Sequence, residues 1–327
     1  MEKVNSVLGP LSASELGFTL VHEHISFGYP GVNSDTTMNP YDRNTVKERA
    51  SMMLTKLKAA GVNTLVDCTP NDCLGRDPDL FMELSKETGI NIICATGLYF
   101  EDFGGPAYWK VRQSLLGYEI SDEIYQMMKT EITRGIGRTQ IKAGVIKVGT
   151  SRGRMTDYEK AVFKAAAMAQ KELGVPIMTH TEGPTMGPEQ ADFLIEAGAN
   201  PRQIAIGHMN NSPDISYYLE VLKRSGVFAS FDRTGMGDHK SKETLAKNIA
   251  ELIKQNYVER ILLSTDYTMT WNGRPFKFPD TMIPLMKDWH PEFIPTGFRE
   301  LLKAQGVTDT QFNIVTVENP KRLYNSN

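Results

Sequence analysis

Eight short apolar runs alternate with helix-like segments along this chain, and that rhythm constrains the fold more than any other feature. The runs cover residues 19–24, 64–68, 91–96, 145–148, 176–180, 204–208, 227–231 and 261–266. Strands that alternate with helices pair in parallel, so eight such units predict a closed (β/α)8 barrel, the TIM barrel. We expect one domain over residues 1–327, because α/β barrels reach this length as a single unit. An open doubly wound sheet is the alternative, but the chain has no GxGxxG or Walker A loop.

The segments outside the strands complete the predicted architecture. Residues 4–17 predict a short N-terminal hairpin, and the region after residue 292 predicts a helical C-terminal segment. Pro40 opens a predicted helix that Gly61 ends. The apolar face of that helix comprises Val46, Met53, Leu57 and Ala60. Residues 97–120 are interpreted as one long aromatic loop.

Composition and charge exclude several classes of protein. The formal net charge of −3 and the lack of a basic run give no sign of a nucleic-acid partner. No stretch approaches the ~18 apolar residues of a membrane span, and the first residues do not form a targeting leader. The three cysteines, Cys68, Cys73 and Cys94, form no CxxC motif and fit reduced thiols. We therefore expect a cytoplasmic protein without nucleic-acid or membrane partners.

Four of the six histidines fall at the carboxyl ends of predicted strands. They are His22, His24, His180 and His208. In a barrel these ends meet at one face, where catalytic groups collect. One histidine in such a place is usually a hydrogen-bonded core residue, but four at one rim are hard to explain as independent accidents. His239 and His290 lie in predicted loops or helix ends and receive no role.

Strand alternation assigns the predicted inward and outward positions. The positions expected to pack on helices are Val21, Ile146, Ile177, Ala205 and Leu263. The positions expected to face the interior are His22, His24, Met178, His180, Ile206, His208, Ser264 and Asp266. Glu23 points outward and is interpreted as structural. Asp266 alone would be interpreted as a helix cap or turn residue, but beside four histidines a metal-ligand role is favoured.

Lys147 is the most informative residue inside a predicted strand. It lies on the face opposite Ile146 and Val148, so alternation turns it toward the interior. An ammonium buried beside metal cations is unfavourable because of both desolvation and repulsion. One chemical resolution is loss of the proton and capture of carbon dioxide as a carbamate. The side chain then becomes an anionic ligand with two oxygens that can bridge two cations.

These side chains together exceed the needs of one metal ion. A single zinc takes three or four protein ligands, whereas the chain offers four imidazoles, one carboxylate and one bridging carbamate. This set fits two divalent ions ~3.5–4 Å apart with a hydroxide between them. Nitrogen and oxygen donors without thiolate suit zinc, cobalt, manganese or iron. We expect two such ions, with zinc as the first choice.

Five motifs in this chain resemble the binuclear site of the phosphotriesterase branch of the amidohydrolase superfamily, and especially the phosphotriesterase-like lactonases. They are His22-Glu23-His24, Val145-Ile146-Lys147-Val148-Gly149-Thr150-Ser151, His180-Thr181-Glu182, Ile206-Gly207-His208-Met209 and Ser264-Thr265-Asp266. The likeness runs from about residue 4 to residue 324. It includes residues 87–97, 185–190 and 271–276, which hold none of the predicted ligands.

The resemblance implies a role for each of these residues. It assigns His22, His24 and Asp266 to the more buried metal, and His180 and His208 to the more exposed one. Carboxylated Lys147 would bridge the two metals. A lysine at this position argues against a sub-branch of relatives that has glutamate at the same place. Tyr99 resembles the family tyrosine that faces the metals and the substrate carbonyl, and Arg233 resembles the arginine behind it.

The predicted function is hydrolysis of lactones, either acyl-homoserine lactones or simple γ- and δ-lactones. A metal-bridging hydroxide would attack the carbonyl, and Asp266 would carry its proton to the leaving alkoxide. Weak phosphotriesterase activity is an expected side reaction. The side chains predicted to line an acyl-chain pocket are Phe27, Trp109, Trp271 and Phe276. The resemblance also implies a homodimer.

Two alternatives remain open at this point. One is a dedicated phosphotriesterase (an aryldialkylphosphatase), or another ester or amide hydrolase of the superfamily, with the same metals. The other is a non-catalytic barrel that binds a ligand or partner. Such a barrel should have lost one or more ligands, and none of the expected set is missing.

Overall fold

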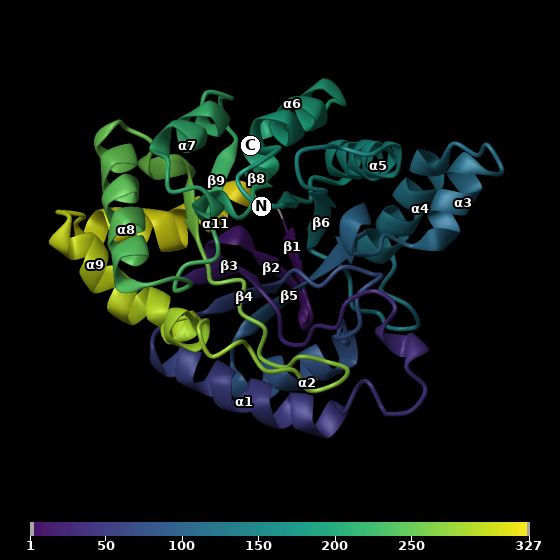
Figure 1. The fold of residues 1–327 in the computed structure, drawn as a ribbon, viewed down its shortest axis with the longest axis horizontal. Helices are drawn as coiled ribbons and strands as arrows, with labels where there is room; N and C mark the ends of the chain where they lie inside the picture. Colours follow the sequence, from purple (N-terminus) through teal and green to yellow (C-terminus); the bar gives the residue numbers. More distant parts are fainter. Residues whose placement is uncertain (1–2, 326–327) are drawn as a thin grey trace.

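A computed structural model of the protein describes residues 3–325, and its strands and helices alternate as expected (Figure 1). Eight parallel strands follow one another in sequence order around one sheet. Their bounds are β3 (Thr19–Glu23), β4 (Thr64–Asp67), β5 (Asn91–Gly97), β6 (Val145–Thr150), β7 (Ile177–Thr181), β8 (Ile204–Ile206), β9 (Phe228–Phe231) and β10 (Ile261–Leu263). The prediction of a (β/α)8 barrel is confirmed.

The barrel closes where β3 meets the segment that follows β10. The amide of Asp266 donates to the carbonyl of His22 at 3.0 Å, and the amide of His24 donates to the carbonyl of Tyr267 at 2.9 Å. The amide of Met269 then donates to the carbonyl of His24 at 2.9 Å. These backbone bonds place His22 of β3 and His24 directly after it beside the predicted carboxylate ligand.

Glu23 fastens the same closure from inside the protein. Its fully buried carboxylate accepts four hydrogen bonds of 2.7–2.8 Å, from the Ser264 hydroxyl, the Thr265 amide and hydroxyl, and the Tyr267 amide. Burial raises the pKa of Glu23 to about 8, against the opposing effect of these donors. Glu23 therefore holds the rim of the barrel together and does not face the cavity.

Helices surround the strands on the outside (Figure 1). Their bounds are α1 (Arg43–Ala59), α2 (Pro78–Thr88), α3 (Ala107–Ser114), α4 (Ile120–Thr133), α5 (Asp157–Leu173), α6 (Gly187–Glu196), α7 (Ile215–Leu222), α8 (His239–Lys254), α9 (Arg299–Ala304), α10 (Asp309–Asn313) and α11 (Asn319–Leu323). The ends of α5 follow from local sequence: Thr156 and Glu159 form a capping box, and Gly174 adopts the left-handed conformation after the last turn.

Two predictions in the first half of the chain are wrong. The helix expected to open at Pro40 begins at Arg43, because the Asp42 side chain accepts hydrogen bonds from two amides of the first turn and caps it. Residues 97–120 are not one loop, since they contain α3. This short helix has no buried residue, so no apolar periodicity marks it in the sequence.

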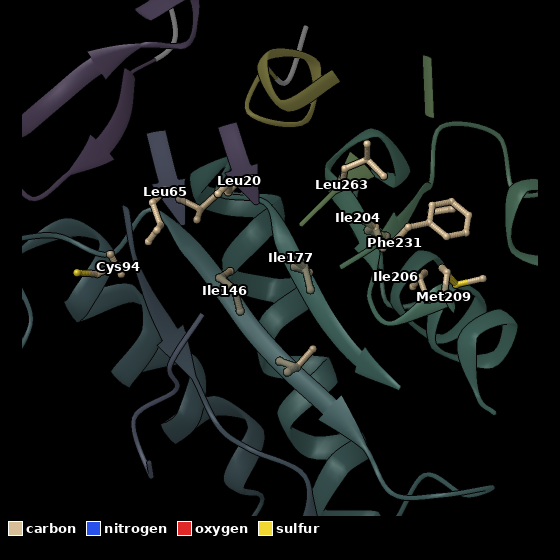
Figure 2. Packing of buried hydrophobic residues seen from close by; sticks show 14 of the residues in the cluster. Leu20, Leu65, Cys94, Ile146, Ile177, Ile204, Ile206, Met209, Phe231 and Leu263 are labelled. Atoms are coloured by element: carbon tan, nitrogen blue, oxygen red, sulfur yellow. The ribbon is translucent and has the colours of Figure 1, made fainter. Parts of the chain in front are cut away.

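Strand side chains divide between two apolar clusters, one inside the barrel and one between the barrel and its helices. The outer cluster includes strand residues such as Ile146 and Ile177 (Figure 2). Helix residues such as Leu54 belong to the same cluster. The inner cluster joins Val145, Met178 and similar strand residues. Both clusters are close-packed, so truncating their large side chains would leave cavities.

Three of the inward and outward assignments are wrong. Val21 and Ala205, expected to face the helices, belong to the inner cluster, and Ile206 belongs to the outer one. In β3 the pairing with β4 shifts register between Leu20 and Glu23, which breaks strict alternation. In β8 the alternation holds, but it is one position out of step with the assignment, because the predicted ligand His208 lies beyond the end of the strand.

The two ends of the chain close the amino-terminal side of the barrel. The predicted N-terminal hairpin is present as β1 (Lys3–Ser6) and β2 (Gly9–Ser12). Val4 and Leu16, with Leu323 of α11, pack into the inner cluster. The opposite, carboxyl side is left for the site. None of the helices within residues 3–325 combines the length and the apolarity that a membrane span requires.

Candidate active site

The six predicted ligands come together at the carboxyl ends of the barrel strands. They lie in β3 (His22), directly after it (His24), in β6 (Lys147), in β7 (His180), and after β8 and β10 (His208 and Asp266). Five of the six are buried, and the Asp266 side chain keeps 13% of its surface exposed. All of them except His208, which lies behind His180, line the floor of one open cavity.

His208 and Asp266 join the other predicted ligands through an uncommon backbone conformation. Their φ angles are 56° and 52°, in the left-handed region that side chains other than glycine seldom adopt. Such a conformation costs on the order of 1–3 kcal/mol and persists where the surroundings impose it, often at functional sites. Strand alternation predicted an inward orientation for both residues, whereas the turn after each strand is what directs them inward.

The first group of converging atoms comprises His22, His24 and Asp266. The Asp266 Oδ1 atom lies 3.4 Å from His22 Nε2 and 3.2 Å from His24 Nε2. One ligand atom from each of the three residues lies within 4.8 Å of the others, which is the spacing of a metal site. On the far side of His24, Nδ1 contacts the Thr69 hydroxyl at 2.8 Å, which fixes the ring.

The second group comprises His180 and His208. The His180 Nδ1 and His208 Nε2 atoms are 2.9 Å apart, and Asp266 Oδ2 lies 3.8 Å from His208 Nε2. His180 Nε2 contacts a carboxylate oxygen of Glu182 at 3.1 Å, which leaves Nδ1 to face the cavity. Burial lowers the pKa of His180 to about 3, so its ring is neutral at physiological pH and can bind a metal.

Asp232 is the main site residue that the sequence analysis missed. It is fully buried, with Oδ2 at 2.7 Å from His22 Nδ1 and Oδ1 at 2.8 Å from His208 Nδ1. Burial alone would raise the pKa of Asp232, but the two imidazoles hold it well below its usual range. The signal was available, because Asp232 directly follows β9 as Asp266 follows β10.

The role of Asp232 is to orient the two rings. A carboxylate that accepts from both Nδ1–H groups leaves both Nε2 atoms free as acceptors toward the cavity. These three residues also lie close enough to suggest a metal site of their own. We assign hydrogen bonds there instead, because contacts of 2.7 and 2.8 Å leave no room for an ion between the atoms.

We expect Asp232→Asn to weaken metal binding about 10- to 100-fold, as the loss of a carboxylate behind a ligating histidine usually does. The amide can accept from only one ring, so the other ring loses its preferred orientation. Metal content after dialysis against graded metal buffers measures the change. Activity should return when metal is supplied in excess, and unchanged metal affinity would contradict this role.

Lys147 lies among the predicted ligands, and its amine contacts an imidazole nitrogen, which a free lysine seldom does. Its Nζ atom is 2.6 Å from His22 Nε2, and the residue is 1% exposed. Burial lowers the pKa of the Lys147 amine. The inward orientation expected from strand alternation is therefore found, and the amine occupies the side of His22 where a metal ligand or bridge would lie.

The donor set fits a metal pair. Imidazole nitrogens and carboxylate oxygens converge from several strands, while Asp232, Thr69 and Glu182 contact the opposite ring nitrogens. The first group offers three ligand atoms and the second offers two. A bridging anion on Lys147 would complete both, which gives each metal the three or four protein ligands it needs.

Tyr99 and Arg233 border the same site. The ring of Tyr99 meets the ring of His180 edge to face, with centroids 5.5 Å apart. Burial raises the pKa of Tyr99 well above its usual value, so the phenol keeps its proton and can donate it in a hydrogen bond. Arg233 Nε donates to Asp266 Oδ2 at 2.9 Å, and Nη1 donates to the side chain of Asn211 at 3.1 Å.

A cavity of about 360 Å³ opens above these groups. Its upper walls are apolar and aromatic: Phe27, Tyr29, Tyr99, Met236, Trp271, Phe278, Met282, Leu285, Met286 and Trp289. Of the four side chains predicted for an acyl-chain pocket, Phe27 and Trp271 line this cavity. Trp109 packs against the outer cluster instead, and Phe276 lines a neighbouring cavity of about 680 Å³.

A parallel barrel whose carboxyl rim gathers imidazoles and carboxylates around one cavity has the architecture of a metal-dependent hydrolase. The particular family follows from comparison with known proteins. The model of the phosphotriesterase family matches residues 2–324, so this chain belongs to the phosphotriesterase family. That family consists of metal-dependent hydrolases that act on small molecules, and the resemblance stated above is confirmed.

Several similar proteins align over nearly the whole chain. A phosphotriesterase homology protein of Mycobacterium tuberculosis (strain ATCC 25618 / H37Rv) is 30% identical, covering 99% of this chain and 98% of that protein. A phospho-furanose lactonase of Mycoplasmopsis synoviae (strain 53) is 30% identical, covering 97% and 90%. The solved structure of an organophosphorus hydrolase from Deinococcus radiodurans has 42% identity and a TM-score of 0.94, covering 99% and 97%.

Proposed function

We propose that this protein is a metal-dependent lactonase that acts on uncharged, largely apolar lactones. The observation that carries the proposal is the wall of the cavity. Ten apolar or aromatic side chains surround about 360 Å³ above the candidate metal ligands. A flexible acyl or alkyl chain is stabilised by such a wall, since burial of apolar surface contributes about 25 cal/mol per Å².

The charges of the cavity support an uncharged substrate. Among the described residues that line it, the basic side chains other than histidines are Lys147 and Arg233. Arg233 is already paired with Asp266, and Lys147 lies under the histidines. A phosphorylated lactone, as the name of the Mycoplasmopsis relative implies for that protein, would find no unpaired basic side chain among these lining residues.

The residues that would hold two divalent metal ions are His22, His24 and Asp266 for one, His180 and His208 for the other, and carboxylated Lys147 between them. Zinc is the first choice, with cobalt, manganese or iron as alternatives. When bound, the metal pair supplies Lewis acidity and lowers the pKa of water to give a nucleophile at neutral pH.

The protein side chains then perform the remaining tasks. Tyr99 donates a hydrogen bond to the carbonyl oxygen as negative charge develops on it. Asp266, held by Arg233, orients the attacking water and takes its proton. The new bond joins the water oxygen to the carbonyl carbon, the bond to the ring oxygen breaks, and Asp266 delivers the proton to that oxygen. The product is a hydroxy acid.

A phosphotriester hydrolase is the second candidate, because a protein with 42% identity is called an organophosphorus hydrolase. A phosphotriester places an oxygen-rich centre under attack by the same nucleophile. We propose weak phosphotriesterase activity as a side reaction and not as the main function.

The deciding experiment compares four substrates with the metal-loaded enzyme: an acyl-homoserine lactone, δ-valerolactone, paraoxon and an N-acyl amino acid. We expect kcat/KM for the better lactone to exceed that for paraoxon by about 100-fold. Equal or higher values for paraoxon or for the amide would overturn the proposal. Less than one equivalent of bound divalent metal after purification with metal supplied would favour the non-catalytic alternative.

We also propose a cytoplasmic, single-domain enzyme that forms a homodimer. Two apolar side chains at the end of α3, Leu115 and Leu116, are 75% and 57% exposed, as side chains at an interface between subunits often are in the separated chain. Light scattering of the purified protein tests this, and a monomer at micromolar concentration would contradict it.

A further inference from the structure

One wall of the cavity is made by residues 275–287, a segment after β10 that we call the strap. Phe278, Met282, Leu285 and Met286 of the strap line the cavity. Two of these side chains also face solvent, since Met282 is 37% and Leu285 is 38% exposed. The strap is therefore a thin wall, and its own apolar burial contributes little to holding it in place.

The strap has few bonds to the rest of the protein along its length. Within residues 3–325 one hydrogen bond joins it to another segment: the amide of Gly237 donates to the carbonyl of Leu285 at 2.9 Å. Of the other backbone bonds of the strap, one comes from just beyond its end, from the Trp289 amide to the Met286 carbonyl at 3.1 Å. The rest are internal, such as that from the Met286 amide to the Met282 carbonyl at 3.1 Å. Its position must therefore be fixed mainly at its ends.

Ion pairs lie at both ends of the strap, but the two differ in burial. Before the strap, Arg274 Nε contacts Asp35 Oδ2 at 2.6 Å, and the Arg274 side chain is 69% exposed. After the strap, Asp288 pairs with Lys242 of α8; the Asp288 side chain is 32% exposed, but the Lys242 side chain is only 5% exposed. An exposed pair contributes little to stability, whereas a buried ammonium that loses its partner is strongly destabilised.

The surroundings of Lys242 make Asp288 hard to replace. Within the described chain, Asp288 is the one carboxylate that pairs with Lys242, and the ring of Phe293 lies 5.7 Å from its Nζ atom. The backbone at Asp288 also packs against Gly235, where an added Cβ would come within 2.2 Å of the Asp288 carbonyl oxygen. Gly235 lies two residues after Arg233, so this backbone contact, which the side-chain pair does not share, adjoins the loop that carries a candidate catalytic residue.

We propose that Lys242 and Asp288 are positioning residues that hold the strap against the cavity and thereby set which acyl chains the enzyme accepts. Neither side chain lines the cavity. The pair acts through Met282, Leu285 and Met286, which contact the distal part of a long substrate and not the reacting carbonyl. The substrate part of this inference rests on the proposed lactonase function.

The kinetic test uses Asp288→Asn with lactones of two lengths. For N-dodecanoyl-homoserine lactone we expect KM to rise about tenfold with kcat nearly unchanged, because contact with the strap is lost equally in the ground state and the transition state. For δ-valerolactone, which is too short to reach the strap, we expect kcat/KM to change less than about twofold. A role in folding alone would change both substrates alike.

Three further variants make the result specific. Lys242→Met removes the pair without leaving a buried charge and should reproduce the KM shift in a well-folded protein. Lys242→Arg keeps the charge and should restore the KM of the parent enzyme at least in part. Asp309→Asn breaks a matched, exposed ion pair with Arg299 and should leave the KM for both lactones unchanged.

Limited proteolysis tests, without any substrate, whether the pair of Lys242 and Asp288 holds the strap in place. Trypsin can cut the strap after Lys277, which is exposed and lies away from the substituted residue. We expect cleavage there to be about tenfold faster in Asp288→Asn than in the parent protein or in Asp309→Asn, because local opening limits cleavage. Unchanged cleavage would contradict the proposal that the pair holds the strap in place. Faster cleavage with an unchanged KM for the long lactone would overturn the role of the pair in substrate specificity. If the parent enzyme opens no lactone, the proposed lactonase function alone is overturned.

Discussion

Replacement of Lys147 by alanine should abolish bound metal and lower kcat/KM by at least about 10³-fold. The reason is that the proposed bridge would be lost from both metal positions at once, and with it the nucleophile and the Lewis acid. The position of the amine supports this expectation, since Nζ lies 2.6 Å from His22 Nε2 in a fully buried setting. Metal analysis and lactone hydrolysis on the same sample measure both effects.

The carbamate hypothesis predicts more than a loss of bound metal and activity. A neutral Lys147 amine adds to carbon dioxide and releases one proton, which leaves an anion with two oxygens. A short carboxylate such as propionate should therefore partly rescue Lys147→Ala, and Lys147→Glu should retain metal without carbon dioxide. Lys147→Met is the matched control, because it fills the same space without a ligand and should remain inactive. Full activity of Lys147→Ala would overturn the hypothesis, and carbon-13 NMR after growth on labelled bicarbonate tests the carbamate directly.

Most of the fold could be predicted from the sequence because the barrel has a strong local signal. Each parallel strand is a short apolar run followed by an amphipathic helix, and this rhythm needs no knowledge of distant contacts. The helix α3 was not predicted because it lacks this signal. It buries none of its residues, so it leaves no periodic trace in the sequence.

The candidate site was predictable in its residue types but not in its geometry. Histidines at strand ends are visible in sequence, and so is a lysine of inward parity such as Lys147. The left-handed turns at His208 and Asp266 are not visible, because a φ angle of 56° or 52° arises from packing around the turn. Those turns made the assignments of Ala205 and Ile206 wrong, although His208 beside them does lie among the other predicted ligands.

Second-layer contacts were the other gap. Asp232 contacts His22 and His208, which are far apart in the chain, and this pairing exists only once the barrel has closed. Glu182 is two residues from His180 and was quoted as part of a motif, yet its contact at 3.1 Å depends on the turn after β7. Orientation by hydrogen bonds is thus the part of such a site that a single sequence reveals least.

Asp266 is the residue for which orientation and chemistry must be separated by experiment. Its two oxygens face different partners, with Oδ1 toward His22 and His24 and Oδ2 toward Arg233. The His208 and His22 rings, the contact with His24 and the Arg233 guanidinium hold the pKa of this carboxyl well below its usual value despite burial. It is therefore ionised at neutral pH, which both metal binding and acceptance of a proton require.

We expect Asp266→Asn to lower kcat by about 10² to 10⁴-fold with little change in KM, since an amide cannot carry the proton to the leaving oxygen. Asparagine is the best choice of variant, because it tolerates the left-handed backbone at this position. Some loss of metal affinity is also expected, because an amide presents one oxygen where the carboxylate presents two.

Excess metal distinguishes the two effects of that substitution. Asp232→Asn affects only the orientation of ligands, so saturating zinc should return most of its activity. Asp266→Asn should bind two equivalents of zinc under the same conditions and still turn over slowly, because the missing function is proton transfer and not metal binding. If zinc restores both variants equally, Asp266 serves as a ligand alone, and another group must protonate the alkoxide that leaves the lactone ring.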